Sequence, residues 1–406
     1  MDLSDRKEHL EFRQEVRAFI AAHRHRVPKV SGQSYRMHPR PFAPDMVAWQ
    51  TLLVENGLAS RTVPTEYGGY GAEPDILKSR IIADEFFAAG VPMGLENQGV
   101  SMLVPTLLEH GTEQQKQDWV ARTIRGEIFW CQGYSEPGAG SDLASLQTRA
   151  VDDGDDFIIN GQKIWTSSAH IAQMIFCLVR TEPDAPKHKG ISYLIFPMDL
   201  PGIEVRPLQT MTGHPSFNET FFTDVCVPKT ALVGPRGAGW QVANSTLKHE
   251  RGMLGNANSS QWRLNRIREM MGRHGPAGQK VSASPVHRNR FIELQARVQS
   301  LRAHEMRLVT GAARGQPPGL GDMVCKLLTC EVNYALDLFA IDLQGELGVE
   351  YDKYSGLDDD GIWQQLSMYD LGLIIGGGTA QIQKNIISER GLGMPREPRL
   401  TEVAGG

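Results

Sequence analysis

The sequence predicts an α+β multidomain fold with an N-terminal helical domain, a central β-barrel or β-sandwich domain and a C-terminal helical bundle. Apolar residues recur at helical spacing near both ends of the chain, and short β-rich runs separated by turns fill the stretch between them. In addition, 406 residues are more than one compact core usually holds. We therefore expect three domains, at residues 1–128, 129–235 and 236–406.

The first domain is expected to consist of amphipathic helices. Leu10, Val16 and Ile20 recur at helical spacing between charged residues, and Ile76–Phe87 and Met102–Ile124 repeat that pattern. Gly, Pro and Tyr are concentrated between the first two of these segments, in the sequence Pro64–Gly69, which is typical of a turn. We interpret that turn as a connector between helices.

The central domain is expected to be built from short strands. Its β-rich runs are bounded by Gly, Pro, Asp and Asn at the spacing of a sandwich or barrel. They are Phe157–Ile159, Met174–Val179, Ile191–Phe196, Ile203–Val205 and Thr220–Phe222.

The last domain returns to a helical pattern after Trp240 and keeps it to about residue 392. Phe291–Thr310 and Met323–Leu343 are long enough to be bundle helices. The polar segment Gly272–Pro285 is expected to be a loop between two helices.

Composition excludes several classes of partner. Lys and Arg number 42 against 47 Asp and Glu, a net charge of −5 that does not favour nucleic acid as the main partner. No apolar run approaches the roughly 20 residues needed to span a membrane, and the charged N-terminus lacks the apolar core of a secretory signal. The 5 scattered cysteines match neither a disulfide framework nor a zinc site, so we expect reduced thiols and a cytoplasmic protein.

Three motifs carry a resemblance to a known family. The first is Trp130–Asp142, which contains Ser-Glu-Pro-Gly-Ala-Gly-Ser-Asp; the second is Gly161–Ser167, and the third is Gly376–Gln383. Together they resemble the acyl-CoA dehydrogenase family, and the resemblance covers nearly the whole chain. It implies a four-helix bundle in the C-terminal domain and FAD as the cofactor, because loops with small residues, hydroxyls and backbone donors suit a flavin.

The resemblance also implies which residues hold the FAD. Ser135 would contact the isoalloxazine edge beside Tyr134, Ser141 would lie between the pyrophosphate and the substrate, and Trp165 would pack on the ring. The other implied contacts are Thr166 and Ser167 at the polar edge, Thr379 and Gln381 at the nucleotide end, and Arg288 and Gln299 toward the flavin of a neighbouring subunit. Alternatively, Arg288 is a solvated helix charge.

One turn of the C-terminal domain departs from the family. Members carry Gln-Ile-Phe-Gly-Gly where this chain has Asp342–Glu346, so the adenosine contacts between subunits are expected to differ.

The catalytic base is displaced in this chain. Many family members carry a catalytic glutamate where this sequence has Gly377, whereas isovaleryl- and long-chain-type members carry it at the position of Glu250. The resemblance therefore implies Glu250 as the base, Arg251 as an anchor for CoA, and Ser141 and Gly378 as substrate contacts. Alternatively, Glu250 is a helix-surface acid paired with Arg251 or Lys248.

The function implied is FAD-dependent α,β-dehydrogenation of an acyl-CoA to the 2,3-enoyl-CoA. Glu250 would abstract the α-proton, a hydride would pass to flavin N5, and an electron-transferring flavoprotein would take the electrons. The expected setting is fatty acid β-oxidation by a homodimer or homotetramer, with a preference for long, branched or bulky acyl groups, including steroid side chains. Two alternatives stay open: an oxidase or a relative acting on a non-CoA substrate, and a catalytically silent partner subunit of a hetero-oligomer.

Overall fold

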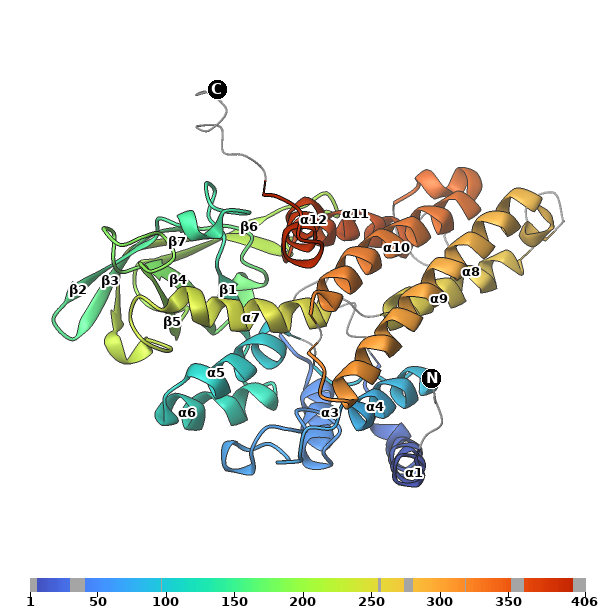
Figure 1. The fold of residues 1–406 in the computed structure, drawn as a ribbon, viewed down its shortest axis with the longest axis horizontal. Helices are drawn as coiled ribbons and strands as arrows, with labels where there is room; N and C mark the ends of the chain where they lie inside the picture. The colour runs from blue at the N-terminus through green and yellow to red at the C-terminus, as the bar shows by residue number, and fades with distance from the viewer. Residues whose placement is uncertain are drawn as a thin grey trace. The chain divides into compact units, whose positions relative to one another are not determined.

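The computed structural model describes residues 6–29, 41–95, 97–254, 257–273, 280–317, 319–351 and 361–396, and the side chains of residues 250–254 lie outside this description. The chain divides into two compact units, Met1–Glu250 and Arg251–Gly406. Helices, then a sheet, then helices follow one another along the chain, which confirms the predicted fold class (Figure 1).

The described residues at the start of the first unit form α-helices. They are α1 (Lys7–His23), α3 (Pro44–Glu55), α4 (Ile76–Ala89), α5 (Val104–His110) and α6 (Glu113–Ile124). Helices α1, α3 and α4 share a core to which Val16, Trp49 and Phe86 contribute. The apolar pattern at 102–124 is divided between two helices, because Thr112 starts α6 anew: its hydroxyl accepts from the N–H of Gln115, whose side chain accepts from the N–H of Thr112.

The middle of the chain forms one sheet of seven strands, drawn in green and yellow-green in Figure 1. The order is β1-β4-β2-β3-β7-β6, with β5 paired to β4. The bounds are β1 (Trp130–Gly133), β2 (Arg149–Asp153), β3 (Asp156–Lys163), β4 (Met174–Arg180), β5 (Ile191–Pro197), β6 (Ile203–Leu208) and β7 (Phe217–Pro228).

Strand β4 lies at the centre of the sheet core. All of its residues are buried, and it pairs in parallel with β1 and antiparallel with β5. Phe157, Ile175 and Phe196 belong to the hydrophobic cluster around it. The five β-rich runs predicted from the sequence lie within β3, β4, β5, β6 and β7. Strands β1 and β2 were not among those runs.

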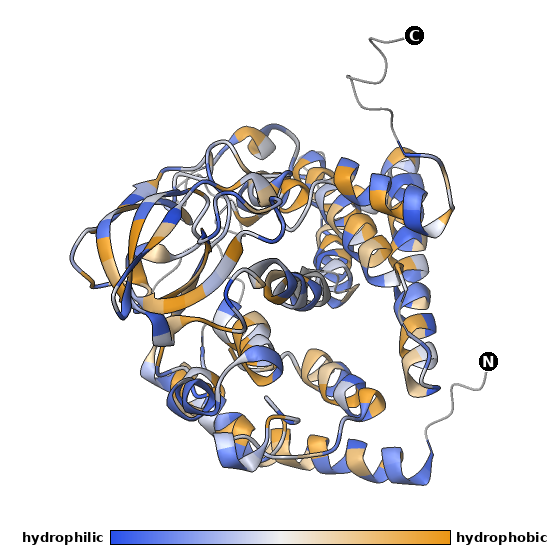
Figure 2. Ribbon diagram, turned by 60° about the vertical axis from the view of Figure 1, so that its left-hand side comes forward, coloured by the Kyte–Doolittle hydropathy of each residue, from blue (hydrophilic) through white to orange (hydrophobic). Residues whose placement is uncertain are grey.

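Helix α7 (Gly239–Leu254) follows the sheet, and the second unit continues with helices. These are α8 (Ala257–Met271), α9 (Pro285–Ala313), α10 (Gly321–Leu343), α11 (Ile362–Ile375) and α12 (Ala380–Ile386). Helix α10 contacts α8, α9 and α11, and α8 also contacts α9, so these four helices form a bundle. Figure 2 shows hydrophobic and hydrophilic residues alternating along the helices, as expected for helices buried on one side.

A buried ion cluster lies inside that bundle. Arg263 on α8 donates from Nε to Asp337 Oδ1 on α10 at 2.8 Å and from a terminal nitrogen to Asp370 Oδ2 on α11 at 3.0 Å. Burial raises the pKa of Asp337 well above its usual range, against the attraction of Arg263, and the neighbouring carboxyl of Asp370 adds to the rise. One guanidinium thus faces two buried carboxyls, and the raised pKa favours a shared proton.

None of the helices in the described ranges combines the length and apolar character that crossing a bilayer requires. The five cysteines are free. Within the described part of the chain, His, Cys, Asp and Glu side chains do not gather into a group that could hold a metal ion.

Candidate functional site

The two motifs of the central domain meet directly. Strand β1 ends at Gly133 and β3 ends at Lys163, and the residues that follow them are neighbours. The N–H of Ile164 donates to the carbonyl of Ser135 at 2.9 Å. The Lys163 ammonium donates to the carbonyl of Tyr134 at 3.1 Å. Segments distant in sequence thus form one continuous surface around Ser135 and Trp165.

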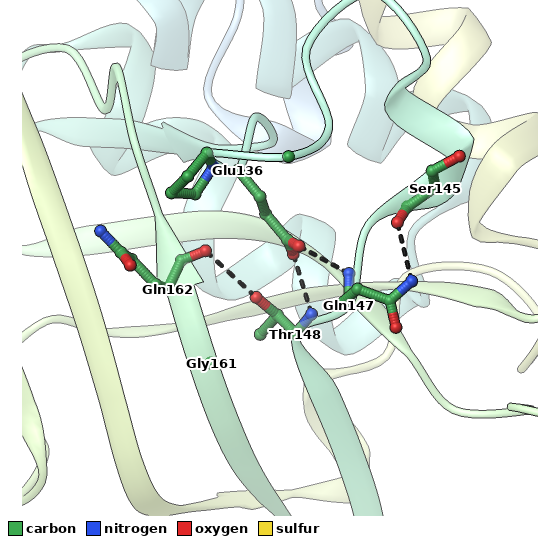
Figure 3. Close-up of a pocket in the computed structure, with 8 residues that line it drawn as sticks. Glu136, Ser145, Gln147, Thr148, Gly161 and Gln162 are labelled. Carbon is green, nitrogen blue, oxygen red and sulfur yellow. Dashed lines mark hydrogen bonds between the residues drawn. The ribbon is translucent and has the colours of Figure 1, made fainter.

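A buried ion pair fixes the glycine-containing loop. Lys163 Nζ lies 2.8 Å from Glu136 Oε1, and both side chains are almost fully buried. The Glu136 carboxylate also accepts from the N–H groups of Gln147 at 2.6 Å and Thr148 at 2.9 Å (Figure 3). Burial alone would raise the pKa of Glu136, but Lys163 and these hydrogen bonds outweigh it and hold the pKa below its ordinary value.

The loop after Glu136 is open to a ligand. A Cβ atom built on Gly138 or Gly140 would meet nothing within 4 Å, and Ser141 is exposed. A cavity of about 530 Å³ lies beside this loop. Its lining, drawn in Figure 3, comes from the loop, from β3 and from the segment before β2: Glu136, Pro137, Gly138, Ser145, Gln147, Thr148, Gly161 and Gln162.

Trp165 presents an exposed aromatic ring in a strained backbone conformation. Its φ is +60°, in the left-handed region, which costs an ordinary L-residue roughly 1–2 kcal/mol. The side chain is 57% exposed, and its ring meets Phe217 edge-on with centroids 6.0 Å apart. The exposed aromatic face offers a surface on which a planar ring can stack.

Thr166 adds a second indication of a ligand. The residue is fully buried, yet its hydroxyl has no hydrogen-bond partner among the described residues. Buried hydroxyls usually find a partner, so an orphan next to an exposed ring is notable. The bare aromatic face, the orphan hydroxyl and the open glycines together fit a flavin.

The sequence reasoning did not single out the basic loop next to this site. Lys187 lies in the β4–β5 connection and donates to both carboxylate oxygens of Asp142, at 2.7 and 2.8 Å. Lys189 in the same connection is exposed, and the ring of His188 packs edge-on against Trp240 at 4.9 Å. The sequence contains one indication of this loop: Lys187, His188 and Lys189 are three consecutive basic residues in a chain whose net charge is −5.

Helix α7 carries the predicted base. Glu250 and Arg251 belong to this helix, but their side chains lie outside the described residues. Thr246, one turn earlier, is fully buried and its Oγ1 lies 2.9 Å from Thr106 Oγ1 on α5. His249 Nε2, on the neighbouring face, lies 3.3 Å from Glu109 Oε1.

In the second unit, the predicted glycine turn is held by two side chains. Gly377 and Gly378 have φ values of +63° and +91°. Lys326 Nζ and Gln383 Nε2 each donate to the carbonyl of Gly378 at 3.1 Å. The next residue, Thr379, starts α12, and its hydroxyl accepts from the N–H of Ile382 at 3.1 Å. Gln381 is exposed on α12.

The remaining predicted contacts lie on α9 and are exposed. Arg288 donates to the carbonyls of Ser282 and Ala283 at 3.0 and 2.9 Å, so it holds the turn that precedes its own helix. Gln299 is exposed further along α9. Their roles toward a flavin stay predictions.

The side chains of the turn Asp342–Glu346, which departs from the family, bond residues of their own unit. Asp342 pairs with Arg290 at 3.0 Å, and Gln344 Oε1 accepts from Gln364 Nε2 at 2.8 Å. These side chains therefore already have partners within their own unit.

Sequence comparisons match three domain families along the chain. The acyl-CoA dehydrogenase N-terminal domain matches residues 6–127, the middle domain residues 131–225 and the C-terminal domain residues 237–392. Acyl-CoA dehydrogenase IpdE1 of Mycobacterium tuberculosis is 38% identical over 361 residues, which cover 87% of this chain and 89% of that protein.

Structure comparison finds the same architecture. A solved structure described as "Tcur3481-Tcur3483 steroid ACAD" is 30% identical, with a TM-score of 0.81 over 98% of this chain and 100% of that chain. The ChsE4-ChsE5 complex from Mycobacterium tuberculosis is also 30% identical, with a TM-score of 0.79 over 98% of this chain and 100% of that chain.

Proposed function

Because the chain belongs to the acyl-CoA dehydrogenase family and is an FAD-dependent oxidoreductase, we propose that it forms the 2,3-enoyl thioester of a bulky acyl-CoA with Glu250 as the base. FAD, when bound, accepts the two electrons removed from the Cα–Cβ bond. The observation that carries the proposal is the junction of the two central motifs, where Ile164 bonds Ser135 beside the exposed ring of Trp165.

Residues of this junction would hold the flavin. The bare face of Trp165 suits the isoalloxazine ring, and the Thr166 hydroxyl is free to bond a polar atom of the ring edge. Tyr134, Ser135 and Ser167 are proposed as further contacts of the flavin. In the second unit, Thr379, Gln381, Arg288 and Gln299 are proposed for the nucleotide end and for the flavin of a neighbouring subunit.

Glu250 is proposed to take the α-proton. Gly377 has no side chain that could do so, and Lys326 and Gln383 already occupy the carbonyl of Gly378. Abstraction of a proton α to a thioester requires a carboxylate whose pKa lies near neutrality, and removing a carboxylate from water is what raises its pKa in that direction.

Positive charge near Ser141 supports a site for the anionic CoA carrier. Lys187 and Lys189 lie in the connection that contacts Asp142, directly after Ser141. The Asp142 carboxylate offsets the charge of Lys187, so the exposed Lys189 contributes most of the positive charge. We add both lysines to Arg251, Ser141 and Gly378 as residues proposed to contact the substrate. Salt screens the attraction between an exposed lysine and a phosphate group. Binding of CoA is therefore expected to weaken as salt is added.

A steroid-derived acyl group is the proposed substrate class. The support is the 30% identity to the structure whose description contains "steroid ACAD". The test is turnover of the purified protein with straight-chain, branched and steroid-side-chain acyl-CoA thioesters and an artificial electron acceptor. Turnover of straight-chain substrates alone would contradict the substrate class. A protein without the flavin absorption band near about 450 nm would contradict the proposed activity itself.

An electron-transferring flavoprotein is proposed as the physiological acceptor. Oxygen consumption during turnover without that partner would identify an oxidase instead. The assembly is proposed to be a homodimer or homotetramer, with a pair of different chains as the competing form, since ChsE4-ChsE5 is described as a complex. Light scattering measures the mass of the protein purified alone and after co-expression with a second acyl-CoA dehydrogenase chain. A change in mass on co-expression would indicate a pair of different chains.

A further inference from the structure

We propose that Asn218 is a positioning residue that holds the turn Trp165–Ser168 in the conformation that receives the flavin ring, and that His170 orients the Asn218 amide. The inference rests on the proposed placement of FAD on this turn.

The turn needs an external constraint because its backbone is strained. Trp165 and Ser168 both have a positive φ, of +60° and +61°. Two non-glycine residues in the left-handed region within four positions persist only when surrounding contacts determine them. The regular ladder between β3 and β7 ends with the pair of Lys163 and Thr220, and beyond it the N–H of Ser168 donates to the carbonyl of Ser216 at 3.2 Å, which leaves the Trp165 end of the turn to be held by other contacts.

Asn218 supplies the constraint from both its backbone and its side chain. The N–H of Thr166 donates to the carbonyl of Asn218 at 3.0 Å, and Asn218 Nδ2 donates to the carbonyl of Thr166 at 2.9 Å. The side chain thus replaces the ladder bond that the strand backbone no longer makes. One residue of β7 thereby holds both backbone polar groups of the residue that follows Trp165.

His170 fixes which way the amide points. The Thr166 carbonyl can only accept, so Asn218 must present Nδ2 to it and turn Oδ1 toward His170, whose Nδ1 lies 3.1 Å away. Since Oδ1 only accepts, Nδ1 of His170 must carry a proton.

The consequence is specific to the cofactor. Asn218 and Thr166 are both fully buried, so water does not replace a hydrogen bond that is lost between them. Loss of the side-chain bond leaves the carbonyl of Thr166 with the long 3.5 Å bond from the N–H of Ala169 and lets the turn relax, which tilts the Trp165 ring and moves the orphan hydroxyl of Thr166. Binding and spectrum of FAD should therefore change more than the stability of the sheet.

Asn160 offers a matched control on the same two strands. Its Nδ2 donates to Asp224 Oδ1 at 2.9 Å, and its Oδ1 accepts from the N–H of Asp224 at 3.0 Å. Asn160→Ala therefore removes an asparagine that also links β3 to β7, but away from Trp165. A purely structural role for Asn218 predicts equal effects of the two substitutions on the cofactor.

The experiment compares Asn218→Ala, Asn218→Asp and Asn160→Ala in the full-length protein. We expect Asn218→Ala to raise the Kd for FAD about tenfold and to shift the flavin absorption band, whereas Asn160→Ala lowers Tm without either change. Asn218→Asp should have the larger effect, because its carboxylate repels the Thr166 carbonyl. Equal FAD affinity and an equal flavin spectrum in Asn218→Ala and wild type would overturn the proposal.

A second pair of variants keeps the test decisive if Asn218→Ala does not fold. His170→Ala should weaken FAD binding in the same direction, and His170→Asn, which retains a donor near the position of Nδ1, should restore it. Failure of the asparagine variant to restore binding would also overturn the proposal. A wild-type protein without flavin bands contradicts the proposed function instead, so the two failures are distinguishable.

Discussion

The N–H of Ile164 donates to the carbonyl of Ser135 at 2.9 Å, and this bond joins the ends of two strands that are not neighbours in the sheet. Strands β4 and β2 lie between β1 and β3 in the strand order, so the bond between the two loops is not part of a ladder between neighbouring strands. Lys163 continues the junction by bonding Tyr134 and Glu136. A change at either loop is therefore expected to move the other.

Lys163→Met should destabilise the protein strongly, because it leaves the buried carboxylate of Glu136 without its partner. Breaking a buried pair in this way typically costs about 3–5 kcal/mol. Urea unfolding of the variant measures the loss. The double variant Lys163→Met with Glu136→Gln should recover part of it, since no charge then remains buried. Equal stability of the single and double variants would show that the ion pair does not fix the loop.

Glu136 should also make stability depend on acid. Its pKa is lowered in the folded protein, so its contribution is present above the unfolded value of about 4.3 and is lost as the pH falls through the folded value. Glu136→Gln should flatten this part of the pH profile. Thermal unfolding of both proteins between neutral pH and pH 3 measures the difference, and parallel profiles would contradict the assignment.

The buried cluster of the helical bundle should respond to pH in the opposite direction. Burial raises the pKa of Asp337 in the folded protein, so the stability it contributes is present below its unfolded value of about 3.9 and is lost as the pH rises through the folded value. Asp337→Asn should remove that loss while Asp370 still pairs with Arg263. The measurement is urea unfolding of both proteins as the pH is raised from below the unfolded pKa of Asp337.

Arg263→Met is the contrasting substitution in the same cluster. It leaves two buried carboxyls without a cation and should lower the free energy of unfolding by about 3–5 kcal/mol at neutral pH. If Arg263→Met lowered the free energy of unfolding less than Asp337→Asn does, one guanidinium would not be stabilising both carboxyls.

Trp165→Ala should weaken FAD binding without changing the stability of the protein lacking FAD. The ring is 57% exposed, and aromatic stacking contributes about 0.5–1.5 kcal/mol, which corresponds to roughly two- to tenfold in Kd. Titration followed by flavin fluorescence measures the Kd. Val151→Ala is the control, since Val151 is 59% exposed in the same sheet. An unchanged Kd in Trp165→Ala would remove the ring from the proposed flavin site.

The sequence predicted the fold well where local signals were strong. Long apolar periods placed α9 and α10, and β-branched runs placed β4 and β5. Strand β1 was not predicted because two of its four residues, Gln132 and Gly133, are not typical of strands. Strand β2 was not predicted because Val151, Asp152 and Asp153 are all exposed, so its sequence lacks the alternation of apolar and polar residues. Both strands form through pairing with distant segments, which local propensity does not report.

The candidate site divides in the same way. The resemblance of the sequence motifs to the acyl-CoA dehydrogenase family singled out Trp165 and Ser135, because each lies within a short continuous motif. The contribution of Asn218 was not, since the residue contacts Thr166 through tertiary structure and lies in an ordinary strand sequence. Lys187 escaped for the same reason: its partner Asp142 is 45 positions away.

Glu250→Gln should abolish turnover and leave the cofactor in place. A positioned general base contributes about 10²–10⁴-fold to the rate, and glutamine keeps the size of the side chain but cannot accept the α-proton. The measurement is turnover of an acyl-CoA with an artificial acceptor, together with the flavin spectrum. Lys248→Gln, an exposed neutralising change two positions earlier on α7, is the control and should keep wild-type turnover.

A second substitution tests whether a carboxylate at position 377, where many family members carry the catalytic glutamate, can replace Glu250. Gly377→Glu in the Glu250→Gln background returns a carboxylate to the third motif, but Gly377 has a φ of +63°, which costs a residue with a side chain about 1–2 kcal/mol. We therefore expect this double variant to regain only a small part of the turnover. Wild-type turnover in Glu250→Gln alone would refute the assignment of the base, because a carboxyl elsewhere would then be removing the proton.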